Sequence, residues 1–192
     1  MNDKLNKALD FNRILFDAFI KPDDIILDAT CGNGNDTLVL AKHLGDKGLV
    51  YAFDIQEIAI ENTRQLLKEN KLIDKVELVL DSHVNIDKYI DKELDFVVYN
   101  LGYLPEGDKS LKTGSNSTIK GIKKALDFMK SGAILLVTCY RGHDGGLDEY
   151  NRVKDFTEKL DQKRFNSFEF HHINQRNYPP VTIGIEVRGG RL

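Results

Sequence analysis

The sequence is poor in cysteine, in long apolar runs and in positive charge, and each shortage narrows the class of protein. Cysteine occurs only at Cys31 and Cys139, which gives no zinc-binding spacing and suits a reducing compartment. No apolar run reaches the ~18 residues of a membrane span, and segment 1–13 is too polar for a signal peptide. We therefore expect a cytoplasmic protein with no membrane association and no bound metal.

The net charge of −3 and the sequence pI near 6.0 do not indicate a nucleic-acid binder, so any contact with phosphate must come from local clusters. The cluster over 154–164 has acidic neighbours and fits a solvated helix face. Acidic residues are sparse in the earlier cluster, which is the stronger candidate. It consists of Lys109, Lys112, Lys120, Lys123, Lys124 and Lys130.

The 192 residues fit one domain, 1–192, with a full hydrophobic core and no internal repeats. Strand-like apolar runs alternate with helical periodicity, which favours an α/β fold with a doubly wound parallel sheet. An amphipathic helix at 3–20, with Ile14 and Phe19 among its apolar positions, is expected against the core or over the cofactor site. The pattern predicts strands at 25–27, 49–53, 76–80, 96–99, 133–139, 165–173 and 181–187, and further helices at 57–70, 118–130 and 147–160.

A strand, a glycine turn and a helix follow one another in residues 25–37, IILDATCGNGNDT. The strand ends at Asp28, and Gly32 and Gly34 allow the backbone to approach a ligand where a Cβ would collide. The following helix start offers unpaired N–H groups to a nucleotide-like cofactor. A dinucleotide site would have glycine in place of Thr37, so NAD is disfavoured. A tight turn without a ligand is the alternative.

The strand at 49–53 ends in Asp54, 20 residues beyond Gly34. Doubly wound nucleotide-binding folds place a carboxylate there that accepts hydrogen bonds from ribose hydroxyls. A surface aspartate that caps the next helix is the alternative.

The stretch NLGYLP, residues 100–105, follows the fourth predicted strand at the sheet edge where open α/β folds bind substrates. The spacing of Asn100 and Tyr103 is similar to the N-P-P-Y motif of amino-methyltransferases that act on nucleic acids. The resemblance implies that Asn100 accepts a hydrogen bond from the target amine and that Tyr103 shapes the pocket. Leu101 and Gly102 replace the two prolines, so a planar base amine is not assured as the target. A turn with a buried tyrosine is the alternative.

Two polar loops follow at the same edge of the sheet. The first, 106–116, is expected to be a mobile substrate loop in which Lys109 and Lys112 contact phosphate. The second contains Arg141, a candidate for phosphate binding, and His143, a candidate for proton transfer. Both are equally compatible with loop residues that have no chemical role.

The motifs DATCGNGNDT, NLGYLPEGDKS, YRGHDGG and NQRNYPP together resemble one family, the small bacterial rRNA methylases, which includes the MnmM/YtqB-like tRNA methyltransferases. The resemblance runs from about residue 8 to residue 187. It implies a Rossmann-like class I methyltransferase fold with seven strands, the last one antiparallel, and S-adenosyl-L-methionine (SAM) as cofactor. Thr30 departs from the glycine that many members carry. The residues implied to hold the cofactor are Asp28, Gly32, Asn33, Gly34, Asn35, Asp54, Gln56, Ser82 and His83, the last two at the adenine ring. A helix cap or a surface histidine with its own partners is the alternative for His83.

The resemblance also implies an activity: N-methylation of the aminomethyl group of 5-aminomethyl-2-thiouridine, a modified wobble uridine in the anticodon region of tRNA. Without the resemblance, the residues predict only a methyltransferase and do not identify its acceptor. An rRNA methyltransferase, a small-molecule amine methyltransferase and a non-catalytic SAM- or RNA-binding module remain alternatives. Because net acidity opposes a large electrostatic footprint on RNA, a homodimer that combines two basic patches is a further possibility.

Overall fold

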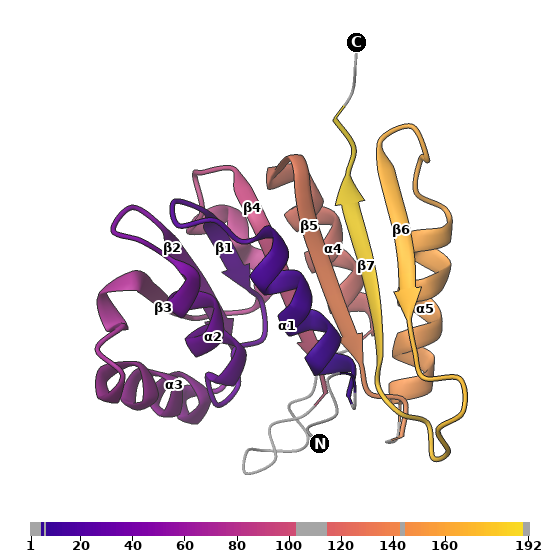
Figure 1. Ribbon diagram of the computed structural model, residues 1–192, viewed down its shortest axis with the longest axis horizontal. Helices are drawn as coiled ribbons and strands as arrows, with labels where there is room; N and C mark the ends of the chain where they lie inside the picture. Colours follow the sequence, from indigo (N-terminus) through magenta and orange to yellow (C-terminus); the bar gives the residue numbers. More distant parts are fainter. Residues whose placement is uncertain (1–4, 6, 103–114, 143–144, 190–192) are drawn as a thin grey trace.

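The computed structural model describes residues 5, 7–102, 115–142 and 145–189, whose strands form a seven-stranded sheet (Figure 1). The strands are β1 (Ile25–Asp28), β2 (Leu49–Asp54), β3 (Val76–Leu80), β4 (Leu94–Leu101), β5 (Met129–Cys139), β6 (Phe165–Phe170) and β7 (Val181–Val187). Their order is β3-β2-β1-β4-β5-β7-β6. Every neighbouring pair is parallel except the two that include β7. The predicted mainly parallel sheet with an antiparallel last strand is therefore confirmed.

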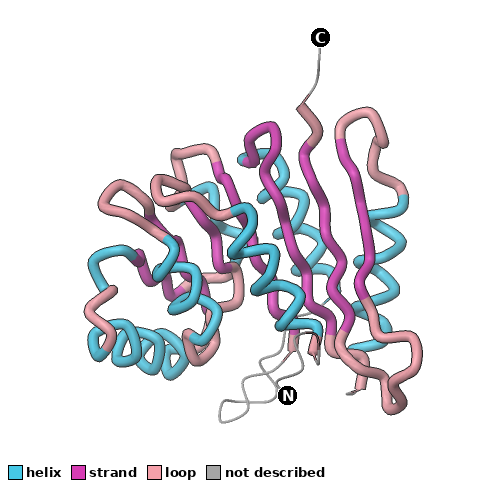
Figure 2. The backbone as a smooth tube through the Cα atoms, in the orientation of Figure 1, coloured by secondary structure: helices cyan, strands magenta, loops and turns pink. Residues whose placement is uncertain are grey.

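Helices cover both faces of this sheet, as Figure 2 shows. On one face lie α1 (Ala8–Phe19), α2 (Asn35–His43) and α3 (Glu57–Glu69), and on the other lie α4 (Ser115–Phe128) and α5 (Gly146–Glu158). Two short 3-10 helices, η1 (Ile73–Lys75) and η2 (His83–Lys88), flank β3. Since the central strands are buried on both sides, they are almost continuously apolar. No helix within the described ranges is long and apolar enough to cross a bilayer.

The α1 helix packs on the sheet through a buried polar residue as well as through apolar ones. Asn12 is only 1% exposed, and its Nδ2 donates to Thr138 Oγ1 over 2.8 Å while its Oδ1 accepts from Thr182 Oγ1 over 2.8 Å. Ile14 and Phe19, which we expected on the apolar face, are 46% and 51% exposed. Because Asn12 forms hydrogen bonds with both threonines, α1 turns this polar side chain toward the sheet. The spacing of apolar residues alone does not predict this orientation.

The β5 strand begins four residues earlier than the predicted 133–139. Met129, which we placed in the preceding helix, pairs with Leu94 at the start of β4, and the register then shifts before Phe96. Gly132 has a φ of 84° in this irregular stretch, a conformation that glycine adopts without steric cost. Pairing with β4 therefore overrides the helical periodicity at Met129.

Candidate active site

A cavity of about 740 Å³ opens at the carboxyl ends of the parallel strands, where open α/β sheets bind their ligands. This volume suits a small-molecule cofactor together with part of an acceptor. Leu9 and Arg13 of α1 form part of its wall, so this helix borders the site. The predicted site residues that line the cavity are Gly32, Asn33, Asn35, Asp54, Gln56, Ser82, His83, Asn100, Leu101 and Gly102.

The other predicted site residues fall into two groups. Tyr103, Lys109, Lys112 and His143 lie outside the described residues, so their roles stay predictions. Asp28, Gly34 and Arg141 are described but are not among the lining residues.

Asp28 supports the glycine turn from behind the cavity. Its side chain is buried, and its carboxylate accepts a 2.6 Å hydrogen bond from Thr37 Oγ1 and a 3.3 Å bond from the Thr30 backbone N–H. Burial raises the pKa of Asp28 to about 7, although the bond from Thr37 opposes this. Asp28 therefore stabilises the glycine turn that lines the cavity.

Glycine is required at the two positions of the turn for different physical reasons. Gly32 has a φ of 53° and lines the cavity, and its backbone N–H donates to Asp54 Oδ2 over 3.0 Å. Gly34 has a φ of 79° at the start of α2, and a Cβ on it would lie 2.9 Å from the Thr63 side chain. Gly32 thus shapes the cavity, whereas Gly34 lets α2 pack against α3.

Asp54 lies at the end of β2 and faces the cavity with both carboxylate oxygens in use. Oδ2 accepts from Gly32, and Oδ1 accepts from the Gln56 backbone N–H over 3.0 Å. Burial raises its pKa, whereas these backbone bonds lower it. Each oxygen has a second lone pair, so the carboxylate is fixed in position and can still accept from a ligand hydroxyl.

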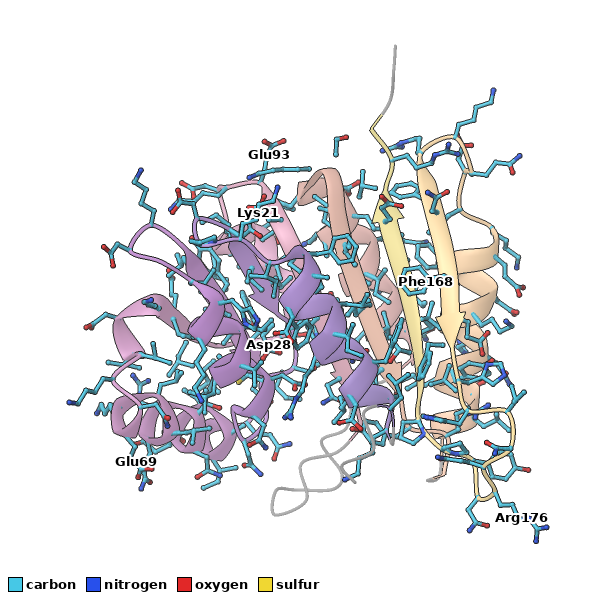
Figure 3. The ribbon with its side chains drawn as sticks, viewed as in Figure 1. Lys21, Asp28, Glu69, Glu93, Phe168 and Arg176 are labelled. Carbon is cyan, nitrogen blue, oxygen red and sulfur yellow. The ribbon has the colours of Figure 1, made fainter. Side chains whose placement is uncertain are left out.

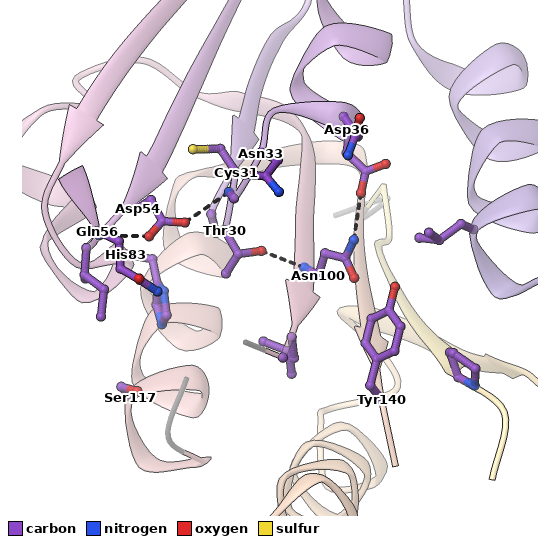
Figure 4. Close-up of a pocket in the computed structure, with 18 of the residues that line it drawn as sticks. Thr30, Cys31, Asn33, Asp36, Asp54, Gln56, His83, Asn100, Ser117 and Tyr140 are labelled. Atoms are coloured by element: carbon purple, nitrogen blue, oxygen red, sulfur yellow. Dashed lines mark hydrogen bonds between the residues drawn. The ribbon is translucent and has the colours of Figure 1, made fainter. Parts of the chain in front are cut away.

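His83 lies buried in the wall beside Asp54 and Gln56 (Figure 4). Its Nε2 atom has no hydrogen-bond partner among the residues described. Burial lowers the pKa of His83, opposed by the backbone carbonyls of Ser117 and Ala29, which favours a neutral ring. This nitrogen lies toward α4, where a Cβ on Gly121 would be 3.2 Å from it. Ser82 caps η2, and its side chain accepts from the Val84 backbone N–H.

Asn100 is fixed by two contacts at the other end of the cavity. Its backbone N–H donates to Thr30 Oγ1 over 2.7 Å, and its Nδ2 donates to Asp36 Oδ2 over 3.0 Å. Its Oδ1 is buried and has no partner in the described part of the chain. Figure 4 shows this oxygen directed away from Asp36 and toward Tyr140. A buried acceptor without a partner is uncommon, and a donor on a ligand would satisfy it.

Asp36 and Tyr140 complete this end of the site. Burial raises the pKa of Asp36, while the bond from Asn100 and the charge of Arg13 lower it. Burial also raises the pKa of Tyr140; the charge of Asp36 adds to this rise, and a hydrogen bond with the Asn100 side chain opposes it. The cavity thus has two chemically different ends: the carboxylate of Asp54 and the neutral ring of His83 lie at one, and the unpartnered amide oxygen of Asn100 lies at the other.

The sequence prediction missed several residues at this site. Asp36 sits two positions after Gly34 on the first turn of α2, and Tyr140 directly follows β5, so both had a positional signal at the correct edge of the sheet. Gly121 had no such positional signal. It makes room for the His83 ring, because a Cβ on it would lie 2.3 Å from His83 Cδ2. Thr30 is explained by its bond to Asn100, which a glycine could not make.

The basic stretch over 109–130 is partly neutralised where it is described. Lys124 forms an ion pair with Asp87 at 2.6 Å, and Lys130 forms one with Asp95 at 2.7 Å. Lys123 lies over the ring of Phe156. These partners reduce the charge that the stretch can offer to phosphate.

Arg141 has a structural partner of its own. Its Nε and Nη2 donate to the Pro179 carbonyl over 3.3 Å and 3.0 Å, and its guanidinium carbon lies 5.2 Å from the centre of the Tyr150 ring. In this arrangement Arg141 braces the connection between β6 and β7. Its role in phosphate binding stays a prediction.

The sheet order, the glycine turn and the acidic residue at the end of β2 define a class I methyltransferase, a class that uses SAM. The chain belongs to one family within this class, because residues 50–186 match the family model described as "Putative rRNA methylase". An Arabidopsis thaliana relative, "tRNA (mnm(5)s(2)U34)-methyltransferase, chloroplastic", is 35% identical over 187 residues, which are 92% of this chain and 68% of that protein.

Solved structures agree with this assignment. One from Clostridium thermocellum, with the same description as the family, is 43% identical with a TM-score of 0.92 and covers 95% of this chain and 98% of its own. Another, from Streptococcus mutans, is described as a "putative methyltransferase" in complex with SAH. It is 33% identical with a TM-score of 0.87, and the match covers 95% of this chain and 99% of that one. The cavity fits the SAM group: a glycine cradle at Gly32, a ribose acceptor at Asp54 and an unpartnered imidazole nitrogen at His83.

Proposed function

We propose that this methyltransferase transfers the methyl group of SAM to the aminomethyl nitrogen of 5-aminomethyl-2-thiouridine at the wobble position of tRNA. The Arabidopsis thaliana relative aligns with most of this chain. Its name supports tRNA as the acceptor. The observation that carries the amine acceptor is Asn100, whose Oδ1 is buried without a partner while its Nδ2 is held by Asp36.

The orientation of the Asn100 amide follows from this bond. In the reverse orientation, Oδ1 would face the Asp36 carboxylate, and two acceptors would oppose each other. The bond therefore leaves Oδ1 as the group available to a ligand, and Oδ1 can only accept. An amine N–H is the complementary donor, and the amine lone pair then remains free to react.

SAM supplies an activated methyl group on a sulfonium centre. With SAM bound, the lone pair of the neutral amine would form a bond to this methyl carbon as the carbon–sulfur bond breaks, the sulfur would leave as the thioether of S-adenosylhomocysteine, and the proton of the resulting methylammonium would pass to solvent. Asn100 orients the nitrogen, Asp36 positions Asn100, and Tyr140 and Leu101 enclose the acceptor. Such positioning supplies much of the rate, since well-oriented intramolecular reactions reach effective molarities of ~10⁵ M or more.

The direct test is transfer of labelled methyl from SAM to bulk tRNA from cells that lack this protein, followed by nucleoside mass analysis. We expect label in 5-methylaminomethyl-2-thiouridine. Parallel reactions offer rRNA and small amines instead of tRNA, and label in either of these with none in tRNA would contradict the proposed acceptor.

Asn100→Ala tests the site itself. We expect this variant to lose turnover by about 100-fold or more, because the amine loses its orienting acceptor, while affinity for SAH stays within about twofold. Asn166→Ala is the matched control, because this asparagine lies on the edge strand β6, where its side chain donates to Glu186 Oε2. Unchanged turnover in Asn100→Ala would remove its assigned role.

A further inference from the structure

The connection between β6 and β7, residues 171–180, brings an exposed aromatic ring to the cavity. Tyr178 and Pro180 line the cavity wall, although the segment lies far from the glycine turn in sequence. Tyr178 is nevertheless 65% exposed, so much of its side chain is open to solvent. The segment follows the edge strand of the sheet and lies near the carboxyl end of β5 (Figure 1).

The backbone at Tyr178 is strained. Asn177 and Tyr178 have φ values of 65° and 51°, in the left-handed region that asparagine tolerates but that is unfavourable for a bulky aromatic residue. Strained backbone persists only where surrounding structure enforces it, and it concentrates at functional sites. Two hydrogen bonds from Arg141 to the Pro179 carbonyl anchor the backbone next to Tyr178. The backbone that carries the Tyr178 ring is thus fixed at the edge of the cavity.

The charge of this connection is also distinctive. Residues 171–180, HHINQRNYPP, contain Arg176 and no acidic residue, in a chain of net charge −3, and His171 Nδ1 lies 3.2 Å from Glu169 Oε1 of β6. Arg176 points outward from the loop in Figure 3, and no ion pair to it occurs within the described residues. Lys124 and Lys130, by contrast, have carboxylate partners.

We propose that Tyr178 is a stacking platform for the nucleobase that carries the acceptor amine, and that Arg176 contacts the adjoining RNA phosphate. This inference rests on the proposed function, because it requires an RNA acceptor. Proteins recognise unpaired bases by stacking them on aromatic side chains and by following the backbone with positive charge. Tyr178 therefore fixes the base while Asn100 orients the amine that the base carries.

The test uses the full-length protein and an anticodon stem-loop RNA that carries 5-aminomethyl-2-thiouridine. We expect Tyr178→Ala to raise the KM for this RNA by about 10-fold or more, as for other stacking residues, with SAH affinity unchanged. Tyr178→Phe and Tyr178→Trp should keep a KM near that of the wild type, because they retain a stacking ring. Ile173→Ala is the matched control, since Ile173 is an 89% exposed apolar residue of the same connection.

Arg176→Gln tests the phosphate contact. The slope of log affinity against log salt should become shallower by about 0.7, the contribution of one phosphate on single-stranded RNA. An unchanged slope would overturn this part of the inference.

The outcomes separate the two proposals. If the wild type methylates the RNA and Tyr178→Ala has a wild-type KM, the stacking inference fails and the proposed function stands. If Tyr178→Phe is as impaired as Tyr178→Ala, the hydroxyl group and not the ring is required, which also overturns stacking. If the wild type methylates no tRNA, the proposed function fails and the inference fails with it.

Discussion

Asp36 determines which end of the Asn100 side chain can meet a ligand. The 3.0 Å bond between Asn100 Nδ2 and Asp36 Oδ2 joins residues that are 64 positions apart, one on the first turn of α2 and the other near the end of β4. The bond consumes a donor of the amide and leaves its oxygen without a partner among the described residues. Asp36 is therefore a positioning residue, which acts through Asn100.

The first prediction compares two substitutions of Asp36. Asp36→Ala removes the acceptor for Asn100 Nδ2, so we expect kcat to fall by about 100-fold, the cost of a small misplacement. Asp36→Asn keeps an oxygen that accepts the same bond, so most of kcat should return. Steady-state kinetics and SAH titration measure both, with the exposed Asp46→Ala as the control.

A double-mutant cycle extends this comparison. If Asp36 acts through Asn100, the combined Asp36→Ala and Asn100→Ala variant should be no slower than Asn100→Ala alone, because coupled residues are not additive. Additive losses, or an Asp36→Asn variant as slow as Asp36→Ala, would show that the carboxylate charge has a role of its own.

The second prediction concerns pH and stability. Burial raises the pKa of Asp28 from 3.8 to about 7, so the folded protein keeps a proton there that the unfolded chain releases near pH 4. The stability that Asp28 contributes is fully present below about pH 4 and is lost as the pH rises toward 7. Asp28→Asn removes this dependence.

Thermal unfolding at about pH 5 and about pH 8 measures this effect. The Tm of Asp28→Asn minus that of the wild type should be several degrees more positive at the higher pH. Comparison between the two pH values cancels the loss from altered hydrogen bonds to Thr37. An equal difference at both values would show that the carboxyl is ionised in the folded protein throughout this range.

The third prediction concerns Gly121 of α4, which leaves room for the His83 ring. A Cβ there would lie 2.3 Å from His83 Cδ2 and 2.9 Å from the Tyr99 hydroxyl, so Gly121→Ala must displace the imidazole. We expect SAH affinity to fall by about 10-fold and Tm to fall by a few degrees, as in an overpacked core. Calorimetric titration and thermal melts test this, with the exposed Asp127→Ala on the same helix as control.

A second substitution separates packing from binding. Gly121→Ala combined with His83→Ala should recover part of the lost Tm, because the clash with the imidazole is gone and only the 2.9 Å approach to the Tyr99 hydroxyl remains. It should not recover SAH affinity, because the ring is gone as well. Recovery of both would show that His83 makes no contact with the cofactor.

Local patterns predicted most of the fold because each depends on residues close in sequence. The apolar runs of the central strands and the glycine turn predicted a doubly wound parallel sheet and the edge at which the cavity lies. The errors occurred where distant residues intervene. Met129 joins β5 because Leu94 pairs with it, and Asn12 is buried because two threonines from other strands bond it.

The same division applies to the site. The sequence alone determined that a glycine turn follows β1, that Asp54 ends the next strand and that Asn100 lies near the end of the fourth, since strand and turn signals are local. Only the tertiary structure decided that Asp36 fixes the Asn100 amide, that Gly121 makes room for His83 and that Tyr178 reaches the same cavity. The physical reason is that hydrogen-bond direction and close packing depend on partners that only the folded sheet brings together.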